Sequence, residues 1–185
     1  MSAKRLFVSI ELPRSVTERF AELDPRLRGV RWLAPEQMHL TLSFLGNVPE
    51  DVEEKLKEKL RAIEWKAFFL PLTGFGAFPS KGRPNVIWIG VGSGHPHLFQ
   101  LHKRVQEAAL SAGLEPDLRS FHPHVTVARC RDVSPEAIRP FLKAHAAFDA
   151  GMIHVEAFCL NSSEVTPAGS VYTRELTVSA RSGDL

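Results

Sequence analysis

The sequence predicts an α+β fold with a mainly antiparallel sheet, and three observations support this. The predicted strands come in pairs with helices between them, an order typical of α+β folds. The pattern His, apolar, Thr, apolar occurs twice, as His39-Leu40-Thr41-Leu42 and as His124-Val125-Thr126-Val127. The copies lie 124 − 39 = 85 positions apart, close to half of the 185 residues, which suggests duplicated halves that face one another. A chain of this length fits one domain or two closely joined lobes.

Alternating apolar residues predict the strands of the first half, and apolar stripes that begin at a proline predict its helices. In chain order we expect a strand over 4–12, a helix over 13–23, a strand over 30–33, the strand with the first His-x-Thr unit over 39–46, and a helix over 49–63. The Glu/Lys run at 53–59 has salt-bridge spacing, so we expect it to form a solvated face.

Glycines and a helix cap mark the second half. Gly74 and Gly76 lie inside a predicted strand and suggest a bulge or bend. Ser134-Pro135-Glu136 caps a helix that ends near residue 145. The second half is expected to hold strands over 68–78, 85–91 and 118–130, a helix over 97–112, the capped helix, and two last strands over 148–161 and 170–180 that flank a polar loop over 162–169.

Composition limits the classes of partner. The net charge is +2 and the sequence pI is about 8.7, too weakly basic to coat long duplex nucleic acid but compatible with a small phosphate-bearing ligand. Cys130 and Cys159 follow no metal spacing and require no oxidising compartment. No apolar run approaches transmembrane length, so we expect a soluble cytoplasmic protein that does not associate with membranes.

Each His-x-Thr unit turns its polar pair to one side. Successive side chains of a strand point to opposite faces, so the His and Thr share a face and the apolar pair takes the other. One interpretation is that two imidazoles and two hydroxyls meet across a cleft. The other is that both units lie on edge strands with polar outer faces. Repetition at half-chain spacing favours the cleft.

Two further residues near the second unit leave alternatives open. His122 lies two positions before His124, so with His39 three imidazoles could hold a catalytic zinc, although such a site would leave both threonines without a role. Arg129 lies five positions after His124, and strict alternation puts it on the opposite face. It reaches the cleft only if the strand twists, bulges or ends there.

Two histidines in one cleft suit a reaction that needs one general base and one general acid. Hydrolysis of a strained cyclic phosphodiester is such a reaction, with one imidazole taking a proton from water and the other giving one to the departing ribose oxygen. Threonine hydroxyls can donate hydrogen bonds to the non-bridging oxygens. This chemistry needs no metal, and we expect no cofactor.

The chain resembles the 2H phosphoesterases, a family named for two His-x-Thr-x tetrapeptides, and specifically its RNA 2′,3′-cyclic phosphodiesterases, once called 2′-5′ RNA ligases. Segments in the family's order cover nearly all of the chain. They are Arg5 to Pro13, His39 to Gly46, Gly74 to Pro79, Val86 to Gly90, Pro123 to Arg129, and Val171-Tyr172. A single tetrapeptide is weak support, whereas two with these flanking segments are strong support.

The resemblance implies two lobes of antiparallel sheet with outer helices, an approximate internal two-fold axis and a central cleft, all within one catalytic domain over residues 1–185. It implies His39 as proton donor, His124 as proton acceptor, and Thr41, Thr126 and Arg129 as phosphate-binding residues. The implied reaction opens the cyclic phosphate of RNA ends or small cyclic nucleotides to a 2′-phosphate, with reversible 2′-5′ ligation as a second reaction. The alternative is an RNA-end binding module with little chemistry. Apart from the resemblance, we expect the chain to be a monomer.

Overall fold

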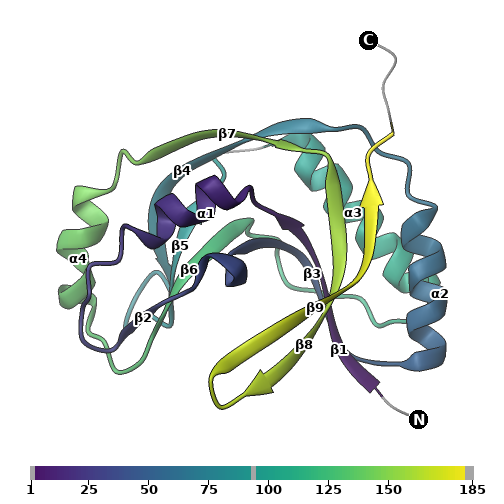
Figure 1. The fold of residues 1–185 in the computed structure, drawn as a ribbon, viewed down its shortest axis with the longest axis horizontal. Helices are drawn as coiled ribbons and strands as arrows, with labels where there is room; N and C mark the ends of the chain where they lie inside the picture. Colours follow the sequence, from purple (N-terminus) through teal and green to yellow (C-terminus); the bar gives the residue numbers. More distant parts are fainter. Residues whose placement is uncertain (1–2, 93–94, 182–185) are drawn as a thin grey trace.

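The computed structural model describes residues 3–92 and 95–181 and shows a curled antiparallel sheet flanked by helices (Figure 1). The elements in chain order are β1 (Ala3–Glu11), α1 (Arg14–Ala21), β2 (Val30–Trp32), the 3₁₀ turn η1 (Pro35–Gln37), β3 (His39–Pro49), α2 (Glu50–Arg61), β4 (Phe68–Phe78), β5 (Val86–Gly90), α3 (Pro96–Ser111), β6 (His124–Cys130), α4 (Pro135–Ala144), β7 (Asp149–Val155), β8 (Ala157–Thr166) and β9 (Gly169–Ser179).

Eight of the nine strands in the described residues follow the order β7-β4-β5-β6-β3-β1-β8-β9, and the ninth, β2, pairs with β6. Strands β6 and β3 join through one residue pair, Leu40 opposite Val125. The sheet therefore divides there into two lobes, the first with β7, β4, β5 and β6 and the second with β3, β1, β8 and β9. The two strands at the junction, β6 and β3, each carry one His-x-Thr unit. Helix α4 packs against the first lobe, while α2 and α3 pack together on the second. The predicted α+β class and the two antiparallel lobes with outer helices are confirmed.

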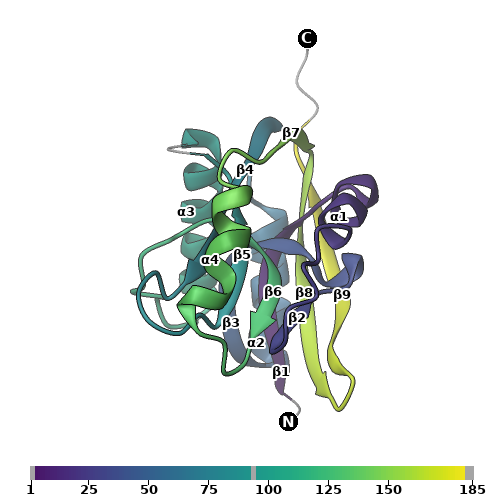
Figure 2. The same ribbon diagram turned by 90° about the vertical axis from the view of Figure 1, so that its left-hand side faces the viewer.

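Helices α3 and α4 lie on the opposite side of the molecule from the β8–β9 hairpin (Figure 2). Figure 2 shows α3 and α4 on one side, with α1 and the β8–β9 hairpin on the other. Within the described residues, none of the helices combines the length and the apolar character needed to cross a bilayer.

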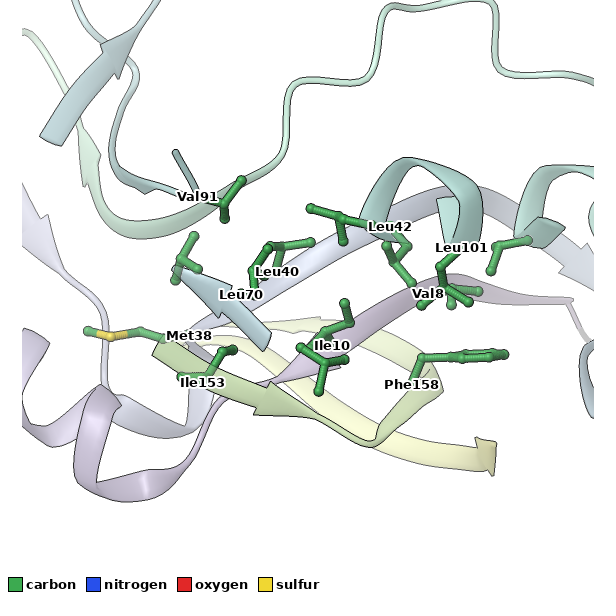
Figure 3. Packing of buried hydrophobic residues seen from close by; sticks show 14 of the residues in the cluster. Val8, Ile10, Met38, Leu40, Leu42, Leu70, Val91, Leu101, Ile153 and Phe158 are labelled. Carbon is green, nitrogen blue, oxygen red and sulfur yellow. The ribbon is translucent and has the colours of Figure 1, made fainter. Parts of the chain in front are cut away.

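The core confirms the alternation predicted for both His-x-Thr units. Leu40, Leu42, Val125 and Val127 are 0–2% exposed, whereas the His and Thr of each unit are only half-buried. Figure 3 shows side chains of β1, β3 and β4 meeting in this core, among them Val8, Leu40 and Leu70. Burial of the apolar pair thus fixes the face on which the polar pair lies.

Two local predictions from sequence are confirmed. Gly74 has φ +71°, a conformation that glycine adopts without strain, and the β4–β7 register shifts between Pro71 and Thr73. The hydroxyl of Ser134 accepts a hydrogen bond from the Ala137 amide at 3.3 Å and caps α4.

The C-terminal region differs from the prediction. It contains three strands rather than two, because Glu156 separates β7 from β8. The segment predicted as a polar loop is the outer half of a hairpin, in which β8 pairs with β9 from Ala157 opposite Ser179 to Thr166 opposite Gly169. Backbone hydrogen bonds hold this hairpin, and apolar alternation gives no signal where neither face is buried. Strand β6 also starts later than predicted, at His124 rather than at residue 118.

The prediction of a solvated face on the charged helix is wrong for Glu53. This side chain is 2% exposed and pairs with Lys4 of β1 at 3.1 Å and with Lys57 at 2.7 Å. A buried carboxylate is costly unless it is paired. The partner from β1 makes the burial tolerable, and this long-range contact is invisible in the local charge pattern.

Candidate active site

The two His-x-Thr units lie side by side on neighbouring strands, at the junction of the lobes. Leu40 pairs with Val125 in antiparallel register, and continuing this register by one residue each way places Thr41 beside His124 and His39 beside Thr126. The expectation of two halves facing one another is thus met by adjacent strands, both in the interior of the sheet. The alternative of two edge strands is wrong.

A cleft of about 910 Å³ lies over this junction. Its lining includes the five residues predicted for acid–base catalysis and phosphate binding: His39, Thr41, His124, Thr126 and Arg129. Residues far apart in the sequence are therefore brought into one solvent-open space.

Backbone carbonyls hold the imidazoles in place. Nδ1 of His124 lies 2.6 Å from the carbonyl oxygen of His122. His39 is likewise hydrogen-bonded to the backbone of Gln37, again two residues upstream. When Nδ1–H of a neutral imidazole donates to a carbonyl, Nε2 is left as a proton acceptor. In His124 this leaves Nε2 available to a ligand in the cleft.

Aromatic rings surround both histidines. The His39 ring stacks on Phe7 at 5.0 Å and meets the edge of Tyr172 at 5.2 Å. The His124 ring lies 5.0 Å from Phe78 and 6.3 Å from Trp88. Burial lowers the pKa of His39 from 6.5 to about 4, and burial also lowers the pKa of His124. Both imidazoles are therefore neutral in the free protein at pH 7.

The charges near the two histidines differ. Glu11 is the cross-strand partner of His39, and its negative charge partly opposes the effect of burial by raising the pKa of that imidazole. The Glu11 carboxylate also accepts a hydrogen bond from Arg174 at 2.5 Å. The nearby charge that acts on His124 is that of His122, and it lowers the pKa of His124. Glu11 thus favours protonation of His39 in particular.

A β-bulge turns Arg129 into the cleft. In the β5–β6 pair, Trp88 is opposite Thr126 but Ile87 is opposite Ala128, so Val127 is an extra residue. Val127 and Ala128 are both fully buried, and the alternation is therefore shifted by one residue. Arg129 consequently lies on the same face of the strand as His124. The sequence allowed this position only if the strand twisted, bulged or ended there.

The first unit has the same bulge, and it exposes a residue that the sequence reasoning missed. Ser9 is opposite Thr41 while Val8 is opposite Ser43, which makes Leu42 the extra residue. Phe44, two positions after Leu42, lines the cleft and is 56% exposed. Phe44 and Arg129 each lie five positions after the histidine of their unit. Aligning the two halves would have paired these residues and identified Phe44.

The zinc alternative finds no support in the geometry. Among the described residues, no group of three or more His, Cys, Asp or Glu side chains is arranged to hold a metal ion. His122 is exposed, its ring lies 6.3 Å from that of Phe78, and it is not part of the cleft lining. The imidazoles of His39, His122 and His124 therefore do not come together in one site.

Comparison with known proteins decides the family. Two stretches, residues 8–88 and 89–172, match the family described as LigT like Phosphoesterase, and each contains one His-x-Thr unit. The chain belongs to the LigT-like phosphoesterase family. The resemblance to 2H phosphoesterases is thereby confirmed, and the double match supports an internal duplication.

Similar proteins align with most of this chain. An RNA 2′,3′-cyclic phosphodiesterase of Aeropyrum pernix is 35% identical over 80% of this chain and 84% of its own length. One of Archaeoglobus fulgidus is 33% identical over 91% of this chain and 96% of its own length. Among solved structures, E. coli LigT complexed with 3′-AMP superposes with a TM-score of 0.82 at 28% identity, covering 98% of this chain and 100% of that chain. A structure from Thermus thermophilus gives a TM-score of 0.77 at 28% identity over 96% of this chain and 98% of that chain.

Proposed function

We propose that this phosphoesterase hydrolyses the 2′,3′-cyclic phosphate of RNA ends or nucleotides to a 2′-phosphate by paired-histidine acid–base catalysis without a metal. The convergence of both His-x-Thr units on one cleft with Arg129 carries this proposal. The names of the relatives support it, as does the 3′-AMP bound to E. coli LigT. Cytoplasmic location, a monomeric state and a single catalytic domain over residues 1–185 stay predictions from the sequence.

In the proposed step, water attacks phosphorus in line with the bond to O3′. Nε2 of His124 takes the proton of the water as the new P–O bond forms. His39 gives its proton to O3′ as the P–O3′ bond breaks, which leaves a 2′-phosphate and a free 3′-hydroxyl. The family resemblance assigns these roles, and the charge of Glu11 beside His39 supports the assignment. Attack by a 5′-hydroxyl instead of water would give the 2′-5′ ligation considered above.

The remaining polar residues bind the phosphate in this proposal. The hydroxyls of Thr41 and Thr126 can donate to its non-bridging oxygens, and the Arg129 guanidinium can donate two parallel hydrogen bonds to them. Negative charge increases on these oxygens in the transition state, so donors fixed in place stabilise it more than the bound substrate.

Phe44 provides a surface for the base, and its replacement is expected to weaken substrate binding. An exposed aromatic ring beside the phosphate site can stack on a nucleobase, a contact worth about 1–3 kcal/mol. Phe44→Leu should raise KM with little change in kcat, while Phe44→Trp should keep KM close to the original value. Steady-state kinetics with a cyclic nucleotide measures both. A Leu variant with unchanged KM would contradict base stacking at this position.

The pH profile should reveal the lowered pKa values. The acid His39 must be protonated while the base His124 is neutral, so kcat/KM should follow a bell. Because burial lowers both pKa values, the bell should lie below the ordinary imidazole range of about 6.5. A bound phosphate anion favours imidazolium, so the basic limb of kcat should lie at higher pH than that of kcat/KM.

Replacement of Glu11 tests which histidine acts as acid. Glu11→Gln removes the negative charge that raises the pKa of His39, so less of the acid is protonated and kcat/KM should fall at pH values above both histidine pKa values and stay unchanged below them. The other charges acting on His39 are those of Arg129 and His124, which stay in place, and Arg174 loses its carboxylate partner and adds to the shift. Glu18→Gln, on the exposed face of α1, is the matched control. A rise in kcat/KM below both pKa values, with no loss above them, would instead make His39 the base.

Product analysis tests the proposed function directly. We expect the wild-type chain to convert 2′,3′-cyclic AMP to 2′-AMP, with the same rate in excess chelator, because no metal enters the proposed steps. His122→Ala should have nearly wild-type activity, since this side chain lies outside the cleft lining. Loss of activity in chelator and its recovery with zinc would contradict the proposal. Binding without turnover would favour the RNA-end binding module.

A further inference from the structure

Two arginines stand directly opposite one another at one end of the cleft. In the β2–β6 pair, Arg31 is the register partner of Arg129, and both side chains are exposed and line the cleft. Their neighbours point inward, since Trp32 donates a hydrogen bond from Nε1 to the Phe20 carbonyl. Residues directly opposite in an antiparallel pair have Cβ atoms about 5 Å apart. The two arginine side chains thus leave the sheet side by side.

No carboxylate among the described residues pairs with this arginine pair. The arginines that form ion pairs lie elsewhere: Arg14, Arg83, Arg119, Arg139, Arg174 and Arg181. Two acidic residues line the cleft, Glu115 and Asp117. The Asp117 carboxylate accepts hydrogen bonds of 2.8 to 3.1 Å from Arg119. Like charges directly opposite on a sheet destabilise it. Phosphate groups bound at the two side chains would offset that repulsion.

Arg31 also lies near the tip of the β8–β9 hairpin. A Cβ atom at Gly169 would come within 3.4 Å of Arg31 Nη1, and Gln37 donates a hydrogen bond to the Ser170 carbonyl at 3.2 Å. Along β6, Arg129 is three residues beyond Thr126, about 10 Å at the rise of an extended strand. Arg31 thus lies at the hairpin end of the cleft, further from the histidines than the threonines are.

We propose that Arg31 binds the phosphodiester adjacent to the reacting cyclic phosphate, so that the cleft recognises an RNA chain end in preference to a mononucleotide. This inference rests on the proposed function. The reacting phosphate has two non-bridging oxygens, and Arg129 with the two threonines already supplies enough donors for them. A second guanidinium at the hairpin end is placed for the next phosphate of the chain.

The test compares two substrates, 2′,3′-cyclic AMP and a triadenylate with a 2′,3′-cyclic phosphate end. Arg31→Gln should lower kcat/KM on the trinucleotide by about tenfold, mainly through KM, and change the value on cyclic AMP by less than about twofold. The slope of log KM against log salt for the trinucleotide should fall by about 0.7, one released counterion of a single strand. Arg31→Lys should keep most of that slope, because it keeps the charge.

Arg28→Gln is the matched control, since Arg28 is an exposed arginine three positions earlier and outside the cleft lining. Equal losses on both substrates in Arg31→Gln, or no loss on the trinucleotide, would overturn the inference. A thermal melt like that of the wild type shows that the variant is folded. If the wild type turns over neither substrate, the proposed function itself fails. If it turns over both and Arg31→Gln behaves like Arg28→Gln, only the role of Arg31 fails.

Discussion

Replacing His39 or His124 with alanine is expected to lower kcat on a 2′,3′-cyclic nucleotide by about 10²–10⁴-fold in each case. Each replacement removes a different proton transfer from the proposed step. Because the two histidines act as a unit, the double variant should lose far less than the product of the two single losses. Single-turnover kinetics of the three variants measures this directly.

His97→Ala provides the control for these variants. His97 is exposed at the start of α3 and lies outside the cleft lining, so its replacement should leave kcat unchanged. Near-wild-type kcat in a folded His39→Ala or His124→Ala variant would contradict paired acid–base catalysis.

The second large effect is expected at Arg129. Removal of one fixed donor to a charge that develops in the transition state costs about 10²–10³-fold in kcat. Arg129→Ala should lose at least this much because the guanidinium carries a full charge, whereas Thr41→Val and Thr126→Val should each lose less. Arg129→Lys should recover only part of the activity, since an ammonium group cannot form the two parallel hydrogen bonds.

Kinetics of the Arg129 variants also checks the bulge in solution. Arg28→Ala, which removes an arginine outside the cleft lining, is the control for charge. If kcat/KM of Arg129→Ala equalled that of the wild type, the side chain would not reach the phosphate, and the shifted alternation after Val127 would have no catalytic role.

Strand periodicity predicts the centre of this site well. The two His-x-Thr units keep regular alternation because Leu40 and Val125, which join the lobes, are both fully buried. A two-residue rule is enough to place each His and Thr on one face, and the spacing of the units was enough to predict the duplication.

The rest of the site depends on contacts that the local sequence does not encode. The bulges at Leu42 and Val127 arise from register with the neighbouring strands, so alternation alone placed Arg129 on the wrong face and gave no role to Phe44. Arg31 gains its place through pairing of β2 with β6, two short strands nearly one hundred positions apart in the chain. The outer half of the β8–β9 hairpin was missed because its pairing does not depend on an apolar face.

The most direct test of the acid–base assignment is the response of the two histidine variants to a substrate with a good leaving group. A cyclic phosphodiester whose departing oxygen is that of a nitrophenol needs no proton from a general acid, while its water nucleophile still needs a base. The account predicts that this substrate restores most of the activity of His39→Ala and leaves His124→Ala inactive. Restoration of His124→Ala with His39→Ala still inactive would exchange the two roles, and restoration of neither would contradict general acid catalysis by this pair.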